Sequence, residues 1–166
     1  MSDLCYFCKF INEKDTYVRK STIIYEDELF YAKLDEFPIA PRHAEVMPKR
    51  HVASLFELTS KEWQMLKPAL ENTVKIITEV DLEKIYLDII SNPFNEKSRE
   101  LCKGMLQHIG FNKKPDAYNF GNNDGEAAGR TIHHLHIHII PRYLGDVPDP
   151  RGGIRNIIPE LGNYCK

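Results

Sequence analysis

The chain has 166 residues, the length of one domain with its own hydrophobic core. Hydrophobic residues make up 42% and charged residues 28%, and the net charge of −2 gives no bulk attraction to nucleic acid or to a membrane surface. No apolar run approaches the roughly 20 residues that span a bilayer, so we expect a single domain over residues 1–166 that works without nucleic acid or membrane partners.

The first feature along the chain is a Cys-x-x-Cys pair formed by Cys5 and Cys8. Asp3 and Lys9 interrupt the start, so we expect no signal peptide and a cytoplasmic protein, in which close cysteines indicate metal binding or redox chemistry before a disulfide. The spacing is typical of zinc sites, which need two further ligands. Two unrelated thiols are the alternative; a thioredoxin-like pair is disfavoured because no βαβ pattern surrounds it.

Two short strands are predicted next, over Thr22–Tyr25 and Leu29–Leu34, across an acidic turn at residues 26–28. Asp35 follows directly, and the residues alone allow either a solvated turn acid or a hydrogen-bond acceptor in a binding site. A loop with two prolines over residues 37–42 then leads to His43, which opens a short apolar segment.

A long helix is predicted from the cap at Thr59 and Ser60 to about Val80. Its apolar residues recur at helical spacing and predict a face in the core: Trp63, Leu66, Leu70, Val74 and Ile77. Pro68 lies inside this pattern, so we expect it to kink or split the helix.

The segment from Asp81 to Gly110 is predicted to be a helical region. Its first half, residues 82–90, is compatible with a helix or a strand, whereas the spacing in residues 95–109 predicts a helix. A strand over residues 116–122 should lead to a turn at residues 123–125. The tail over residues 142–166 is expected to be irregular, with a short strand at residues 154–158.

Three histidines two residues apart, His134, His136 and His138, alternate with apolar residues. Strict alternation predicts a half-buried strand with the three imidazoles on one face, and Pro141 should end that strand. Such imidazoles can bind a catalytic metal ion, or one of them can be a nucleophile that its neighbours position. A strand whose polar face merely happens to carry histidines is the third reading.

The string from His134 to Ile140 resembles the histidine triad family of nucleotide hydrolases and transferases. The following Pro141-Arg142 is more similar to its dinucleoside polyphosphate hydrolase branch, which includes the fragile-histidine-triad proteins, than to its nucleoside phosphoramidase branch. The resemblance covers roughly residues 5–142, with residues 81–110 as a helical insertion. It implies an α+β fold, in which a five-stranded antiparallel sheet carries a long helix, and usually a homodimer.

The resemblance also implies a mechanism. His136 would attack the α-phosphate of a nucleotide and form a covalent nucleotidyl-histidine, His138 would bind a phosphate oxygen and assist the leaving group, and His134 would buttress the site or bind zinc. A main-chain carbonyl near the first histidine would fix the tautomer of the nucleophile. The family often carries a structural zinc, for which the matching ligands are Cys5, Cys8, His51 and His134; no catalytic metal is expected.

Further positions match the family's substrate site. Asp35 would accept hydrogen bonds from ribose hydroxyls, and His43 would lie behind the triad. Three residues would hold phosphate oxygens: Asn123, Gly129 and Thr131. Arg130 stands where the family usually has Gln, and its guanidinium either favours a longer polyphosphate or points to solvent.

The sequence leaves the substrate open. A dinucleoside polyphosphate, with adenine as the base, is the first expectation and a nucleoside phosphoramidate the second. Two readings of other classes are a metal-dependent hydrolase with the three triad histidines as ligands of a catalytic ion, and a nucleotide-binding module without catalysis.

Overall fold

A computed structural model describes residues 5–12 and 20–162. Five strands form one antiparallel sheet in the order β1-β2-β3-β5-β4, and their bounds are Ile23–Glu26 (β1), Phe30–Leu34 (β2), Ala44–Pro48 (β3), Ala117–Gly121 (β4) and Ile137–Arg142 (β5). The longer helices are Tyr6–Asn12 (α1), Ser60–Ile77 (α2), Leu82–Ser91 (α3) and Glu96–Leu106 (α4). The predicted α+β fold, with a five-stranded antiparallel sheet and a long helix, is confirmed.

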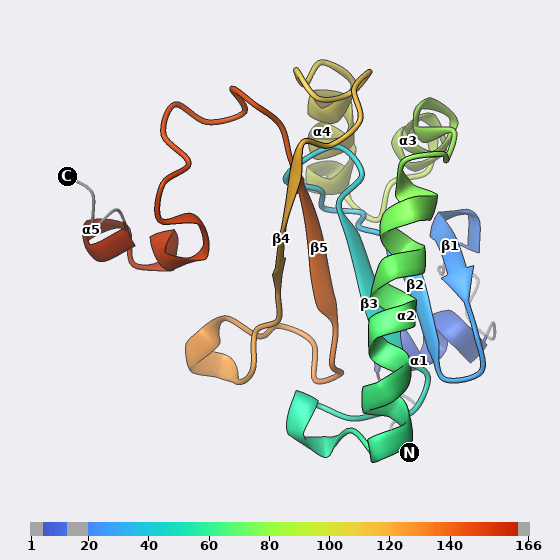
Figure 1. Cartoon of the computed structure of the whole chain (residues 1–166). Coiled ribbons are helices and arrows are strands. Elements are labelled where there is room, and N and C mark those ends of the chain that lie inside the picture. The colour runs from blue at the N-terminus through green and yellow to red at the C-terminus, as the bar shows by residue number, and fades with distance from the viewer. Residues whose placement is uncertain (1–4, 13–19, 163–166) are drawn as a thin grey trace.

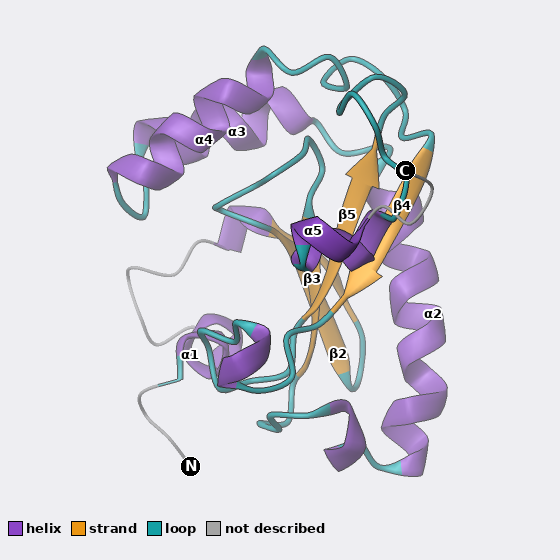
Figure 2. Cartoon of the chain, turned by 90° about the vertical axis from the view of Figure 1, so that its left-hand side faces the viewer, coloured by secondary structure: helices purple, strands orange, loops and turns teal. Residues whose placement is uncertain are grey.

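The two faces of the sheet carry different residues. Side chains alternate between faces along a strand, so Phe30, Ala32 and Leu34 of β2 join the core cluster shared with α2. Tyr31 belongs instead to a second cluster, formed with α1. Figure 2 shows the sheet between α2 on one side and α1 on the other. Helix α1 therefore covers the face that also receives the polar residues of β2, β3 and β5.

Helix α2 begins with a capping box, in which Thr59 and Glu62 bond to each other's backbone N–H groups. The Glu62 carboxylate also accepts two hydrogen bonds from Arg50, at 2.8 and 2.7 Å, and Arg50 lowers the pKa of Glu62 to about 2. The expected split at Pro68 is wrong, since the helix runs unbroken through it. Packing of one face on the sheet stabilises the helix enough to tolerate the lost backbone bond. Trp63 was expected in the core but is 57% exposed.

The undecided segment after residue 81 is the helix α3, and α4 follows as predicted. The Asn95 side chain caps α4 by accepting a hydrogen bond from the Ser98 amide. The Ser98 hydroxyl donates to the carbonyl of Glu36 at 2.7 Å, so α4 is tied to the loop that follows β2. That residues 81–110 are an insertion remains a prediction.

Strand β5 differs from its expected bounds. It begins at Ile137, after His134 and His136, and continues through Pro141 to Arg142. Pairing with β3 ends at Ile139, whereas pairing with β4 continues to Arg142. The Asp116 amide donates to the Arg142 carbonyl, so the backbone groups of Arg142 point toward β4. Those of the preceding residue, Pro141, point toward β3, beyond Ile139, where the pairing with β3 has ended. Proline therefore removes no ladder bond here.

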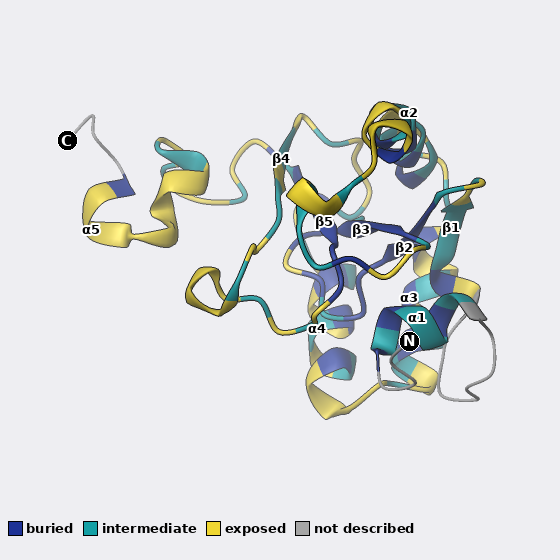
Figure 3. Cartoon of the chain, turned by 90° about the horizontal axis from the view of Figure 1, so that it is seen from below, coloured by how far each residue is buried: buried dark blue, intermediate teal, exposed yellow. Residues whose placement is uncertain are grey.

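The C-terminal segment is irregular, as expected, but the predicted strand at residues 154–158 is wrong. A 3-10 helix, Gly153–Ile157, and a short helix α5, Pro159–Gly162, occupy this place, and residues 163–166 lie outside the described part. Gly152 and Gly153 have positive φ angles, which turn the backbone out of an extended conformation where the 3-10 helix begins. Figure 3 shows this arm as largely exposed. Three more 3-10 helices are short: Lys20–Thr22, Leu55–Glu57 and Glu126–Ala128.

None of the described helices combines the length and apolarity needed to cross a membrane.

We predict that Gly110→Ala destabilises the fold. A Cβ at this position would overlap the ring of Tyr143, which is 2% exposed and is held by a hydrogen bond from its hydroxyl to the Pro41 carbonyl. The ring cannot move freely, so the free energy of unfolding should fall by roughly 1–3 kcal/mol. Urea titration measures it. Gly104→Ala is the control, since nothing lies within 4 Å of its Cβ and α4 should gain helix propensity. Equal stability of the two variants would contradict the prediction.

Candidate functional site

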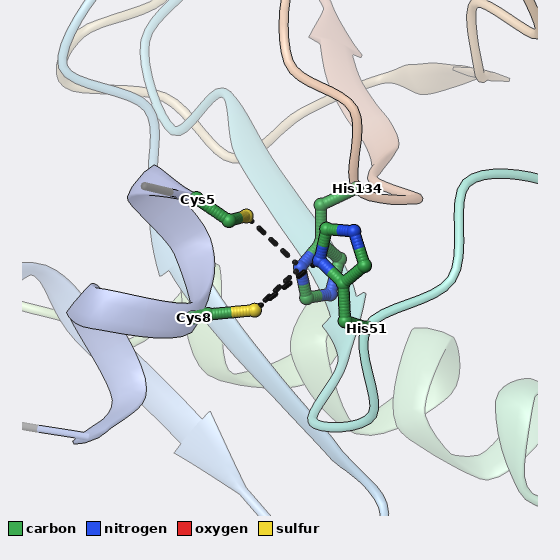
Figure 4. A group of neighbouring side chains, drawn as sticks. All are labelled: Cys5, Cys8, His51 and His134. Carbon is green, nitrogen blue, oxygen red and sulfur yellow. Dashed lines mark hydrogen bonds between the residues drawn. The ribbon is translucent and has the colours of Figure 1, made fainter. Parts of the chain in front are cut away.

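A Cys/His cluster joins three distant segments of the chain (Figure 4). Cys5 directly precedes helix α1 and Cys8 lies in it, the loop after β3 supplies His51, and the segment before β5 supplies His134. The Nδ1 atom of His134 lies 3.5 Å from both sulfur atoms, and Nδ1 of His51 lies 3.3 Å from Cys8 Sγ. All four ligand atoms lie within 4.8 Å of one another. The predicted residues are therefore brought together, and this cluster could bind a metal.

The donor set fits zinc. Tetrahedral zinc with Zn–S of about 2.3 Å and Zn–N of about 2.0 Å places sulfur and nitrogen ligands about 3.5 Å apart, as the sulfur–nitrogen distances here do. The Nε2 atom of His134 lies 2.8 Å from the Pro48 carbonyl, to which it donates a hydrogen bond. This bond leaves the Nδ1 lone pair free to bind a metal, and such a partner is usual for a ligating histidine.

His136 is oriented by the neighbouring main chain. Its Nδ1–H donates to the carbonyl of His134 at 2.8 Å, so the lone pair of a neutral ring is on Nε2. The Phe7 ring of α1 packs against the imidazole with a centroid distance of 5.3 Å. Burial lowers the pKa of His136, and the Arg130 and Lys33 charges act in the same direction. The ring is thus neutral at pH 7, as a nucleophile or a metal ligand must be.

His138 is in contact with a second histidine. Its Nδ1 lies 3.1 Å from Nε2 of His43, which is 3% exposed. On the other side of that ring, Nδ1 of His43 lies 3.2 Å from a carboxylate oxygen of Asp35, although the N–H is not aligned for a hydrogen bond. Burial and the neighbouring His43 lower the pKa of His138 to about 4. The imidazoles of His43 and His138 are therefore both neutral at pH 7.

Asp35 lies beside this pair. One carboxylate oxygen accepts a hydrogen bond from the Phe37 amide at 2.8 Å, and the other faces His43. Burial raises the pKa of Asp35, but His43 and Lys33 outweigh burial and the pKa is lowered overall. An ionised carboxylate with unused lone pairs can still accept from a hydroxyl of a ligand.

A buried polar layer beneath the histidines was missed in the sequence. Lys33 is 2% exposed, and its Nζ lies 3.4 Å from Glu36 and 3.6 Å from Glu45. Glu45 in turn lies 3.9 Å from Nδ1 of His138, opposite which it is paired across β3 and β5. Burial raises the pKa of Glu45, whereas Lys33 opposes that shift. A signal is present in the sequence: Lys33 and Glu45 each interrupt an otherwise apolar strand.

The predicted phosphate-binding residues lie on the connection between β4 and β5. Asn123, Gly129 and Thr131 are exposed there, and the Asn123 amide donates to the Gly129 carbonyl at 3.4 Å. Gly129 has a φ of 87°, a conformation that favours glycine. Arg130 donates from Nη1 to the Ala53 carbonyl at 2.8 Å, while its buried Nε has no protein partner. Contact with phosphate remains a prediction for all four.

The three triad imidazoles do not converge on one point. In the described chain, the clusters besides the cysteine site that could hold an ion combine a carboxylate with two histidines: Asp35, His43 and His138, and Glu45, His136 and His138. His134 belongs to the cysteine cluster instead. The three histidines thus have different surroundings: His134 could bind a metal with the cysteines, His136 has a free Nε2 lone pair, and His138 contacts His43.

Comparisons with known proteins identify the family. Residues 16–145 match the HIT domain family. An uncharacterized HIT-like protein of Methanocaldococcus jannaschii is 31% identical over 143 residues, which cover 86% of this chain and 82% of that protein. The bis(5'-adenosyl)-triphosphatase of Dictyostelium discoideum is 29% identical over 125 residues, which cover 75% of this chain and 62% of that protein.

Among solved structures, a zinc-bound histidine triad family protein from Mycobacterium smegmatis has a TM-score of 0.54 to this chain at 24% identity. The alignment covers 96% of this chain and 90% of that one, and the likeness is one of fold. Since the family match spans most of the residues and includes the sheet, the triad and the loop before it, this chain belongs to the HIT family.

Proposed function

We propose that the chain is a nucleotide hydrolase or nucleotidyl transferase that attacks the α-phosphate of a dinucleoside polyphosphate through His136. The observation that carries this proposal is the hydrogen bond from His136 Nδ1 to the His134 carbonyl, which leaves the Nε2 lone pair for phosphorus. In the first step, Nε2 forms the N–P bond while the bond to the leaving phosphate oxygen breaks. Water then cleaves the nucleotidyl-histidine and restores the free ring.

The protonation of His138 favours the polyphosphate over the phosphoramidate. A polyphosphate leaves as an anion without a proton, whereas the amine of a phosphoramidate must be protonated as it leaves. Burial and the contact with His43 lower the pKa of His138 in the free protein, which disfavours it as a proton donor to an amine. Similarity to a bis(5'-adenosyl)-triphosphatase supports a dinucleoside polyphosphate as the substrate and adenine as the base.

The remaining site residues would hold the substrate. We propose that Asp35 accepts from the ribose hydroxyls, that Asn123 and Thr131 bind phosphate oxygens, and that His138 contacts the leaving phosphate. Gly129 has no side chain and so leaves room for a phosphate, although its own amide donates to the Glu126 carbonyl at 2.8 Å. The buried Nε of Arg130, without a protein partner, is available for a further phosphate oxygen. Charges fixed before the reaction would stabilise the transition state without reorganisation.

We also propose a structural zinc at Cys5, Cys8, His51 and His134. Four protein ligands leave no open position for substrate, so the ion would fix helix α1 to the triad segment rather than act on phosphorus. A homodimer and a cytoplasmic location complete the proposal. The exposed apolar side chains of the C-terminal arm support the homodimer: Ile154, Ile157, Ile158 and Leu161.

His136→Gly should abolish turnover because the variant lacks the attacking nitrogen. We expect hydrolysis of diadenosine triphosphate to fall at least roughly 10³-fold. His133→Ala is the matched control, since His133 is the exposed neighbour of the triad and should retain activity. Intact-mass analysis of a quenched wild-type reaction should detect a nucleotide attached to the protein. Full activity of His136→Gly would end the proposal, and faster hydrolysis of adenosine phosphoramidate by the wild type would reverse the substrate preference.

Zinc removal should loosen the fold near the triad. We expect one zinc per chain by elemental analysis, a large loss of bound zinc in Cys8→Ser, and a lower melting temperature after chelation. Cys102→Ala is the thiol control, because Cys102 lies buried in the α2-side core and outside the Cys/His cluster. Full zinc occupancy in Cys8→Ser would contradict the ligand set.

A further inference from the structure

The connection between α3 and α4 places an aromatic ring at the edge of the site. Phe94 lies between the two helices and is 54% exposed. Its ring meets Tyr6 of α1 at a centroid distance of 6.0 Å and Phe37 at 5.7 Å, both in T-shaped geometry. Neither neighbour stacks on the Phe94 ring, and more than half of its surface stays open to a ligand.

Several bonds hold this aromatic group beside Asp35. The Phe37 amide donates to the Asp35 carboxylate at 2.8 Å, and the Tyr6 hydroxyl donates to Glu36 at 2.6 Å. From the other side, the Ser98 hydroxyl of α4 donates to the Glu36 carbonyl. The short segment from residue 35 to residue 37 thus links the carboxylate to the rings of α1 and of the α3–α4 connection.

Local helix structure does not explain the aromatic residue. Phe94 directly precedes Asn95, the N-cap of α4, where an apolar side chain commonly packs on the fourth residue of the helix. That fourth residue is Arg99, whose guanidinium instead bonds to the Ile90 carbonyl and to Glu96. The usual apolar contact is therefore absent from this helix start. A large exposed ring is then free for another purpose.

We propose that Phe94 is the residue on which the nucleobase stacks, which makes the α3–α4 connection part of the nucleotide-binding site. The inference rests on the proposed function, in which Asp35 holds the ribose. The base is one glycosidic bond from that ribose, so it must lie close to the Asp35 segment. Every base has a π face, and stacking on an aromatic side chain is the commonest way to bind it without reading its identity. This geometry fits a site that tolerates several bases.

The test compares two ligands that differ only by the base. Calorimetry of the full chain should show adenosine 5'-monophosphate binding roughly tenfold more weakly to Phe94→Ala than to the wild type, while ribose 5-phosphate binds both equally. Phe94→Leu keeps the apolar bulk beside Tyr6 and Phe37 and should lose the same affinity, whereas Phe94→Trp should retain it. Trp63→Ala is the control, since Trp63 is 57% exposed on α2, on the opposite face of the sheet.

Equal binding of the monophosphate by wild type and Phe94→Ala would overturn the inference, as would an equal loss for both ligands, or a wild type that binds neither. Binding is measured without turnover, so the result is separate from the His136→Gly experiment. If His136→Gly is inactive but Phe94→Ala binds the monophosphate as tightly as the wild type, only the stacking role is wrong. If His136→Gly is active but Phe94→Ala loses affinity for the monophosphate and not for ribose 5-phosphate, only the covalent mechanism is wrong.

Discussion

Two main-chain carbonyls decide what the histidines of this site can do. The Pro48 carbonyl accepts a hydrogen bond from the Nε2–H of His134 and so directs its Nδ1 toward Cys5 and Cys8. The carbonyl of His134 accepts a hydrogen bond from the Nδ1–H of His136, which leaves the Nε2 lone pair free. Adjacent identical side chains thus acquire opposite tautomers and separate roles. The Pro48 carbonyl belongs to strand β3, and the His134 carbonyl lies in the bend before β5, next to the Leu135 amide that donates to the Val52 carbonyl.

Helix α1 depends on the same contacts. It is only seven residues long, too short to be stable alone, and it lies on the sheet through its aromatic residues and the cysteine cluster. One of these residues, Phe7, packs against both His134 and His136. A metal that held α1 in place would therefore also fix the Phe7 ring beside His136. Such an ion would affect the geometry around His136 without contacting the substrate.

Burying charged residues on the sheet face beneath the triad costs free energy. A lysine and two glutamates lie almost fully buried there, and isolated charges of this kind cost several kcal/mol each to desolvate. Lys33 offsets part of this cost by contacting both Glu36 and Glu45, and it lies over the rings of Tyr6 and Phe10. The carboxylates outweigh burial and raise the pKa of Lys33, so the lysine stays charged. The layer keeps a polar environment next to His138 while water is excluded.

The sequence by itself determined the strands around the first turn, the long capped helix, the α4 helix and the family, because alternation, capping residues and the histidine string are local patterns. It also named Cys5, Cys8, His51 and His134 as one set, through resemblance. Only the tertiary structure decided that β5 begins after His136, that Pro141 stays in the strand, and that Lys33, Glu45 and Phe94 border the site. These outcomes depend on which strand or helix lies alongside, and contacts between distant segments leave no periodic trace in the chain.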